Sequence, residues 1–152
     1  MPARFNHMEL TVAPGVLDAQ RDDIRRFYSE LLGWSATDVP ILGQVGLLLR
    51  TDPATSQFIL VTEQKVHIDS PGYDHLGMRV DTRREVDDCL ARAKELQSAD
   101  ERVLIKEYDD LVNGDHVTHA FYVRFLLPIW FDIQCFERAG EPEPDRWAYV
   151  DG

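Results

Sequence analysis

The residues of this chain whose types and spacing could support chemistry are two histidines in equivalent places of a weak internal repeat. Segment 5–12 resembles segment 73–80: each starts with an aromatic residue, then Asn or Asp, then His, with apolar residues at every second place after it. Neutral imidazole is the commonest side-chain ligand for metal ions. The repeat therefore predicts that His7 and His75 form a metal-binding pair. The competing interpretation is two hydrogen-bonded structural histidines.

Both histidine segments alternate with the period of β-strands, which places successive side chains on opposite faces. One face of each segment is apolar and is expected to pack on a helix, whereas the other face carries the histidine. The histidine-bearing faces are His7, Glu9 and Thr11 in the first segment and His75, Gly77 and Arg79 in the second. Glu9 could act as a general base if burial moves its pKa toward neutrality, or it could form a salt bridge with Arg79.

Each half of the chain closes with a further strand, predicted at 58–63 and at 132–137. The pattern of the second strand extends back to residue 129 and separates an apolar face from a mixed one. The mixed face carries Trp130, Asp132, Gln134 and Phe136. Trp130 and Phe136 could stack on a planar substrate or serve as ordinary packing residues. Asp132 could be a metal ligand, a base or a charge at the rim.

Amphipathic patterns predict two helices, at about 18–32 and 82–97. Gly33 is expected to end the first helix, and Thr82 or Asp81 to cap the second. Further strands are predicted at 34–39, 45–50, 102–108 and 117–125, with loops at 51–56 and 112–115. Each half of the chain is thus predicted to contain one strand, one helix and three more strands.

With this order of elements the chain resembles the vicinal oxygen chelate superfamily, which includes glyoxalase I, bleomycin-resistance proteins and extradiol dioxygenases. The resemblance rests on the two histidine strands, the final strand around Gln134, and the helix segment Asp23–Trp34 with its Phe-Tyr, Leu and Gly-Trp residues. It implies an α+β fold in which paired βαβββ modules, at about 5–64 and 73–138, form a curled mixed β-sheet cup with the helices outside.

The same resemblance implies that residues 1–138 form a single domain, followed by an extended C-terminal tail at 139–152 that Trp147 and Tyr149 could dock onto a neighbour. Segment Arg124–Trp130 is strongly apolar where relatives have a short polar turn. Large apolar patches are rarely exposed to water, so we expect this segment to cover the mouth of the cup or to be buried in a dimer contact. The superfamily implies a homodimer.

Metal-using members of the superfamily hold a divalent cation in the cup, with ligands from the first and last strands of each module. Carried over position by position, the resemblance places these ligands at His7, His75, Gln134 and Leu60. Leu60 cannot bind a metal, which argues against a four-ligand cage and against glyoxalase I itself. Gln134 is neutral, so Asp132 or Glu9 would supply the missing charge, directly or through water. The ion stays open among Fe, Mn, Ni, Zn and Mg, with a metal-free protein as the alternative.

The resemblance predicts a small-molecule enzyme in which a divalent metal binds two adjacent substrate oxygens. Its reaction would be that of an isomerase, a lyase or a ring-cleaving dioxygenase, with Glu9 or Asp132 moving protons. The residues expected to contact substrate are Arg79, Trp130 and Phe136. The alternative is a binding protein without catalysis, similar to the bleomycin-resistance members, that holds a planar cationic drug. A third interpretation is a metal-free relative whose segment Phe125–Trp130 mainly forms a dimer.

Composition excludes several other classes of protein. The chain has 152 residues, with 16 basic and 27 acidic side chains and a formal net charge of −11, which disfavours nucleic acids and anionic membranes as partners. No apolar run approaches the roughly 20 residues that span a bilayer. The two cysteines, Cys89 and Cys135, each lie in an apolar pattern and are predicted to be reduced core residues of a cytoplasmic protein.

The remaining polar residues carry no motif for catalysis. His67 is predicted to be exposed, and His116 and His119, three residues apart, should lie on opposite faces of one strand. The pairs Asp87–Asp88 and Asp109–Asp110 are interpreted as solvated charges. Serine-hydrolase, P-loop and dinucleotide-binding fingerprints do not occur in the sequence.

Overall fold

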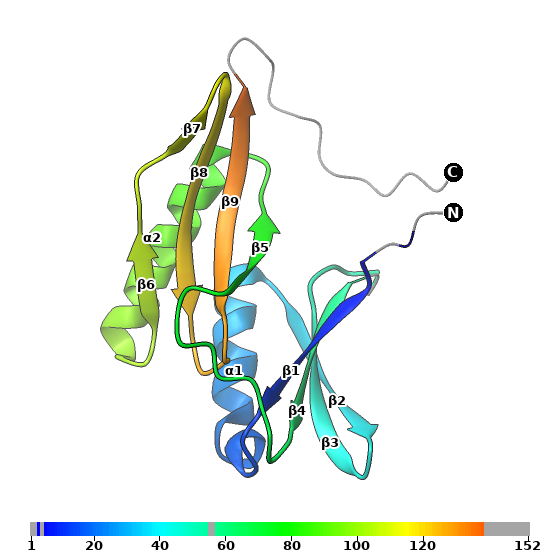
Figure 1. The fold of residues 1–152 in the computed structure, drawn as a ribbon. Coiled ribbons are helices and arrows are strands. Elements are labelled where there is room, and N and C mark those ends of the chain that lie inside the picture. Colours follow the sequence, from blue (N-terminus) through cyan, green and yellow to red (C-terminus); the bar gives the residue numbers. More distant parts are fainter. Residues whose placement is uncertain (1–2, 4, 55–56, 139–152) are drawn as a thin grey trace. The chain divides into compact units, whose positions relative to one another are not determined.

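The computed structural model describes residue 3, residues 5–54 and residues 57–138 (Figure 1). Its contacts divide the chain into two compact units. Of the described residues, unit 1 contains those up to Tyr73 together with Phe125–Ile129, and unit 2 contains Asp74–Arg124 and those from Trp130 to Arg138. The predicted tail at 139–152, with Trp147 and Tyr149, lies outside the described residues.

Unit 1 has the order strand, helix and three strands. These elements are β1 (His7–Val12), α1 (Val16–Leu32), β2 (Ser35–Ile41), β3 (Gln44–Arg50) and β4 (Phe58–Glu63). The sheet order is β1-β4-β3-β2, in which β1 and β4 are parallel and the other neighbours antiparallel. As predicted, α1 ends at Gly33, whose positive φ of 69° is accessible to glycine without a steric cost and whose N–H donates to the Ser29 carbonyl.

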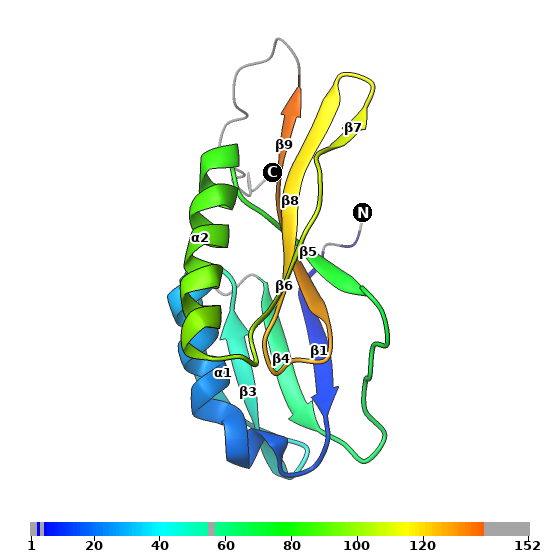
Figure 2. The same ribbon diagram turned by 90° about the vertical axis from the view of Figure 1, so that its left-hand side faces the viewer.

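Unit 2 repeats this order with one extra strand. Its elements are β5 (His75–Arg79), α2 (Arg83–Ala99), β6 (Leu104–Glu107), β7 (Leu111–Asn113), β8 (His116–Arg124) and β9 (Trp130–Arg138). The sheet order is β5-β9-β8-β6, with β7 paired to β8, and α2 lies along one face of this sheet (Figure 2). Thr82 caps α2 as predicted, in a reciprocal capping box with Glu85. The predicted α+β class and paired βαβββ order are confirmed.

Strand β7 lies where a loop was predicted. Its three residues are all exposed, so they show no alternation of apolar and polar side chains that a sequence pattern could reveal. The strand instead owes its place to a hairpin with β8. Gly114 provides the turn with a positive φ of 66°.

The apolar segment before β9 belongs to the core of unit 1, which makes both predicted destinations, the cup mouth and a dimer contact, wrong. The Phe125 ring stacks on Phe27 of α1 with 4.4 Å between ring centroids, and the Tyr28 hydroxyl donates to the Phe125 carbonyl at 3.1 Å. Leu127 is also almost fully buried. Between them Leu126 takes a positive φ of 58°, which a leucine rarely adopts, and the Leu127 N–H donates to the Phe125 carbonyl. Burial on both sides holds this turn in place.

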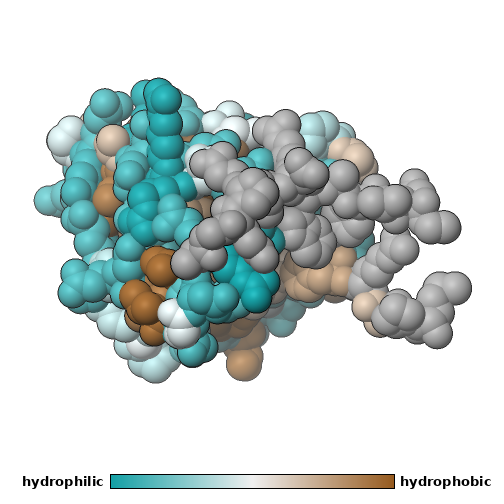
Figure 3. Space-filling model, turned by 90° about the horizontal axis from the view of Figure 1, so that it is seen from above, coloured by the Kyte–Doolittle hydropathy of each residue, from teal (hydrophilic) through white to brown (hydrophobic). Residues whose placement is uncertain are grey.

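On the face seen from above, the coloured residues are mostly hydrophilic, with a few hydrophobic residues among them (Figure 3). In the described part of the chain, no helix is long and apolar enough to cross a membrane. Cys135 is fully buried as predicted, whereas Cys89 is only half-buried on α2. Burial raises the pKa of both thiols, which keeps them protonated and unreactive.

Candidate functional site

One face of the unit 2 sheet collects most of the residues predicted to do chemistry. α2 packs against β8 and β9 on the opposite face, over buried apolar residues such as Phe131 and Ile133. Strand alternation therefore directs the mixed side chains of β9 away from α2. The residues on this open face are His75, Gly77 and Arg79 of β5, Tyr122 of β8, and Trp130, Asp132, Gln134 and Phe136 of β9.

His75 and Asp132 form the centre of the open face. In the parallel register His75 lies opposite Trp130, and Asp132 lies opposite Gly77, so the two side chains are diagonal neighbours. The His75 Nε2 is 3.8 Å from the Asp132 Oδ2. This distance exceeds a hydrogen bond. The His75 side chain is 39% exposed and that of Asp132 is 8% exposed, so a buried carboxylate faces an accessible imidazole.

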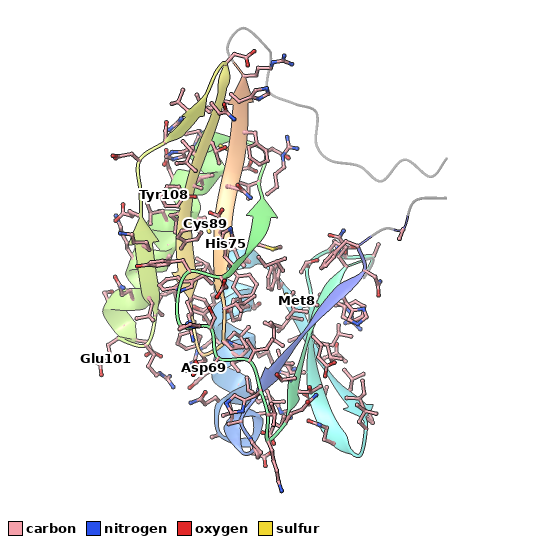
Figure 4. The ribbon with its side chains drawn as sticks, in the orientation of Figure 1. Met8, Asp69, His75, Cys89, Glu101 and Tyr108 are labelled. Atoms are coloured by element: carbon pink, nitrogen blue, oxygen red, sulfur yellow. The ribbon has the colours of Figure 1, made fainter. Side chains whose placement is uncertain are left out.

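Asp132 is held from its other side by a tyrosine. Tyr108 directly follows β6 (Figure 4), and its hydroxyl donates to the Asp132 Oδ1 at 3.0 Å. Burial raises the pKa of the Asp132 carboxyl, although the Tyr108 hydrogen bond and His75 favour the carboxylate. The pKa of Tyr108 is raised far above its usual value, first by burial and then by the charge of Asp132. Tyr108 therefore remains a hydrogen-bond donor over the whole physiological pH range.

Aromatic rings surround this pair. Tyr122 lies opposite Asp132 in the antiparallel register, and its ring centroid is 4.9 Å from that of His75 and 5.1 Å from that of Tyr108. Trp130, which is 9% exposed, meets Tyr122 edge-on at 6.4 Å. Sequence patterns had singled out Trp130 but neither tyrosine. The alternation of side chains within β8 could have indicated the face on which Tyr122 lies. Tyr108 follows the last residue of β6, so no strand alternation in the sequence pointed to it.

The other predicted residues of the open face have different surroundings. A Cβ atom at Gly77 would come within 2.6 Å of the Gln134 Nε2, so the amide of Gln134 lies across the bare backbone of Gly77. The Arg79 guanidinium is 5.3 Å from the ring centroid of Phe136, which is 40% exposed. Arg79 and Phe136 thus contact each other at the end of β5, four residues after His75.

In unit 1, His7 and Glu9 lie on the equivalent strand β1. The His7 ring stacks almost parallel on Phe58 with 4.9 Å between centroids, and its Nδ1 lies 2.8 Å from the Asn6 Oδ1. With a proton on Nδ1 donated to this amide oxygen, a neutral ring would carry its lone pair on Nε2. Glu9 accepts a hydrogen bond from the Thr62 hydroxyl at 2.6 Å. Its predicted roles, as a base or as a partner of Arg79, stay predictions.

The strand registers correct the sequence alignment of the two halves. His7 lies opposite Phe58, and His75 lies opposite Trp130. Two residues further along, the partner of Glu9 is Leu60 and the partner of Gly77 is Asp132. Asp132, rather than Gln134, is therefore the counterpart of Leu60. The match of the two final strands by sequence had paired Leu60 with Gln134 instead, and Gln134 as a metal ligand stays a prediction.

One member of each acidic pair, Asp87 and Asp110, takes part in a network on the other side of unit 2. His119 of β8 lies 2.7 Å from Asp87 through its Nε2 and 2.7 Å from Asp110 through its Nδ1. Arg83 donates to Asp110 and to Glu137 of β9, with closest distances of 2.6 and 2.7 Å. Asp87 and Asp110 are exposed, as predicted, but they also pair with cations from distant parts of the chain, which local sequence does not show.

This network perturbs its members in the expected directions. Arg83, followed by His119, lowers the pKa of Asp110 to about 2. Burial lowers the pKa of His119, but the hydrogen bonds to Asp87 and Asp110 outweigh burial and the charge of Arg83, so the net shift is upward. As predicted, His116 lies on the opposite face of β8 and His67 is exposed.

The donor set of unit 2 fits a divalent metal in part. Ligand atoms about 2.1 Å from an ion are about 3 Å apart when adjacent and about 4.2 Å apart when opposite. The separation of 3.8 Å between His75 and Asp132 falls inside this range. Across the described ranges 5–54 and 57–138, no cluster of three or more His, Cys, Asp or Glu residues is placed to hold a metal. The described residues of unit 2 therefore provide two candidate metal ligands on this face, His75 and Asp132.

No protein-family model matches this sequence, and no curated protein matches it significantly. Solved structures do match its fold. The fosfomycin resistance protein FosX of Listeria monocytogenes has a TM-score of 0.61 at 17% identity, with 89% of this chain and 92% of that chain covered. Lactoylglutathione lyase of Agrobacterium tumefaciens has a TM-score of 0.57 at 16% identity, with 89% and 95% covered. An integron cassette protein of V. cholerae has a TM-score of 0.57 at 17% identity, with 89% and 96% covered.

FosX and lactoylglutathione lyase both have the vicinal oxygen chelate fold. The resemblance recognised in the histidine strands and in the helix signature is therefore confirmed at the level of fold.

Proposed function

We propose that this protein is a metal-dependent enzyme that acts on a small molecule with two adjacent oxygen atoms. The observation that carries the proposal is the spacing of His75 and Asp132, 3.8 Å apart on the open face of unit 2. Asp132, which the register makes the counterpart of Leu60, supplies the anionic ligand that Gln134 could not. His7 as a further ligand stays a prediction from the sequence. The metal, among Fe, Mn, Ni, Zn and Mg, stays open.

Structures of FosX support this proposal. They include a complex with Mn(II) and sulfate and, in a mutant form of that protein, one with Mn(II) and 1S,2S-dihydroxypropylphosphonic acid. The second ligand carries hydroxyl groups on adjacent carbons, which is the arrangement expected of a substrate here. A bound divalent ion would polarise such oxygens and stabilise the negative charge that develops on them.

The chain's own side chains would bind and orient the substrate. Tyr122 offers a ring surface next to His75, and the amide of Gln134 offers a hydrogen-bonding group on the same face, whereas Trp130, at 9% exposure, stays only a predicted substrate contact. The three reaction classes predicted from the sequence, those of an isomerase, a lyase and a ring-cleaving dioxygenase, all stay open. A homodimer and a cytoplasmic location also stay predictions, and light scattering of the purified protein tests the first.

Metal analysis of protein purified without a chelator or an affinity tag tests the proposal. We expect about one divalent ion per chain, and at least a tenfold weaker affinity in His75→Ala and in Asp132→Asn. His67→Ala and Asp109→Ala change exposed residues of the same types and should bind metal as the native protein does. Native protein that binds no ion when incubated with Mn²⁺, Fe²⁺, Ni²⁺, Zn²⁺ and Mg²⁺ would overturn the proposal, as would undiminished binding by His75→Ala.

A further inference from the structure

The two oxygens of the Asp132 carboxylate have different neighbours, and Tyr108 contacts only one of them. Its hydroxyl occupies the Oδ1 at 3.0 Å, while the Oδ2 faces the His75 Nε2 at 3.8 Å. A carboxylate that rotates freely about its terminal bond can present either oxygen or both to a cation. The hydrogen bond at Oδ1 removes that freedom and leaves Oδ2 as the oxygen directed at His75.

The position of Tyr108 in the sheet fits a role in orientation. The residue follows β6, whose antiparallel pairing with β8 brings it beside Tyr122, with ring centroids 5.1 Å apart. Tyr108 is half-buried and packs beside the Tyr122 ring, which limits its rotamers, so its hydroxyl reaches Asp132 from one direction. A donor held in this way costs little further entropy when a ligand binds to the carboxylate.

We infer that Tyr108 is a positioning residue, which fixes Asp132 as a monodentate metal ligand through Oδ2. The inference rests on the proposed function, because it assigns a role toward the same metal. Groups that hydrogen-bond to ligands commonly change metal affinity by about 10–100-fold when they are removed. A purely structural role for Tyr108 would instead change the stability of unit 2 and leave the affinity for metal unaltered.

The experiment compares Tyr108→Phe with Tyr28→Phe in the full chain. Each variant loses one hydroxyl, and Tyr28 donates its hydroxyl to the Phe125 carbonyl in unit 1. Metal-free protein is titrated with Mn²⁺ and with Zn²⁺ by calorimetry, and thermal unfolding is measured without metal. We expect Tyr108→Phe to bind each ion about 10–100-fold more weakly, and Tyr28→Phe to bind both ions as the native protein does while melting at a lower temperature.

Two results separate the inference from the function on which it rests. If the native protein and Asp132→Asn both fail to bind the ions, the proposed function itself fails. If the native protein binds metal, Asp132→Asn loses it, and folded Tyr108→Phe retains the native affinity, the proposed function survives and the role of Tyr108 is refuted. A folded state for Tyr108→Phe is checked by circular dichroism. Should that variant not fold, Tyr108→Leu, which also removes the hydroxyl, replaces it, and native metal affinity in folded Tyr108→Leu would equally refute the role while Asp132→Asn loses metal.

Discussion

Replacing Arg83 by Gln should destabilise unit 2 by about 2 kcal/mol and raise the pKa of His119. Arg83 lies in the first turn of α2 and joins that helix to Asp110 and to Glu137 of β9. Its side chain and those of its two partners are 35–43% exposed. Exposed ion pairs contribute about 0.2–1 kcal/mol each, and two bidentate pairs stand near the upper end of that range.

The pH dependence of this loss follows from the directions of the pKa shifts. Arg83 holds the pKa of Asp110 near 2, so the stability gained from that pair is present above the ordinary carboxyl pKa and is lost as pH falls toward 2. The pKa of His119 is raised, so its contribution is present below its ordinary pKa and is lost as pH rises through the folded value. The charge of Arg83 repels the protonated form of His119, whereas a neutral Gln would not, so protonation of His119 would stabilise the variant more than the native protein. The variant should therefore lose more stability at about pH 8.5 than at about pH 5.5.

Chemical denaturation at both pH values and an NMR titration of the His119 ring measure these effects. For a chain of this length, a loss of about 2 kcal/mol corresponds to a fall in melting temperature of roughly 4–8 °C. Arg84→Gln is the matched control, because Arg84 and its partner Asp88 are 89% and 72% exposed and 3.6 Å apart. The reasoning is refuted if the pKa of His119 falls in Arg83→Gln, or if Arg84→Gln is equally destabilising.

Two further predictions concern packing. Phe125→Ala should lower the free energy of unfolding by about 3–5 kcal/mol, because it removes a 2%-exposed ring that packs on Phe27. Urea denaturation measures this loss. A loss below about 1 kcal/mol would show that the segment is not part of the core of unit 1. Gly77→Ala should change the free energy of unfolding by less than about 1 kcal/mol, because the added Cβ meets only the movable end of the Gln134 side chain. The NMR resonances of the Gln134 side-chain amide should shift. Unchanged resonances would contradict the contact between Gln134 and Gly77.

Sequence patterns predicted the elements that carry periodic signals. The helices were placed to within two residues at each end, because Gly33 and Thr82 are physical end signals rather than statistical ones. The alternation within β5 and β9 correctly divided their side chains between two faces. Local regularity is visible in a sequence because each residue's face depends on its own position in the element.

Pairings between distant segments were not visible in this way. The offset between Leu60 and its counterpart depends on strand register, which the hydrogen bonds of the sheet fix and a motif count does not. The place of Phe125 depends on an aromatic contact with α1, almost one hundred residues earlier in the chain. Tyr108 was missed for the same reason, since its importance comes from a hydrogen bond to Asp132 and not from its neighbours in sequence.

Two of the imidazole–carboxylate groups in unit 2, those of His75 and His119, differ in their distances. His119 lies at 2.7 Å from both of its carboxylate partners, which is shorter than the separation of about 3 Å between adjacent ligands of one ion. An ion would have to break those contacts, so the charges of this group serve to join α2 to β8 and β9. The 3.8 Å between His75 and Asp132 is too long for a hydrogen bond and suits an ion held by both groups. Strand alternation keeps the two groups on opposite faces of one sheet, so the first can stabilise unit 2 without supplying competing ligands to the second.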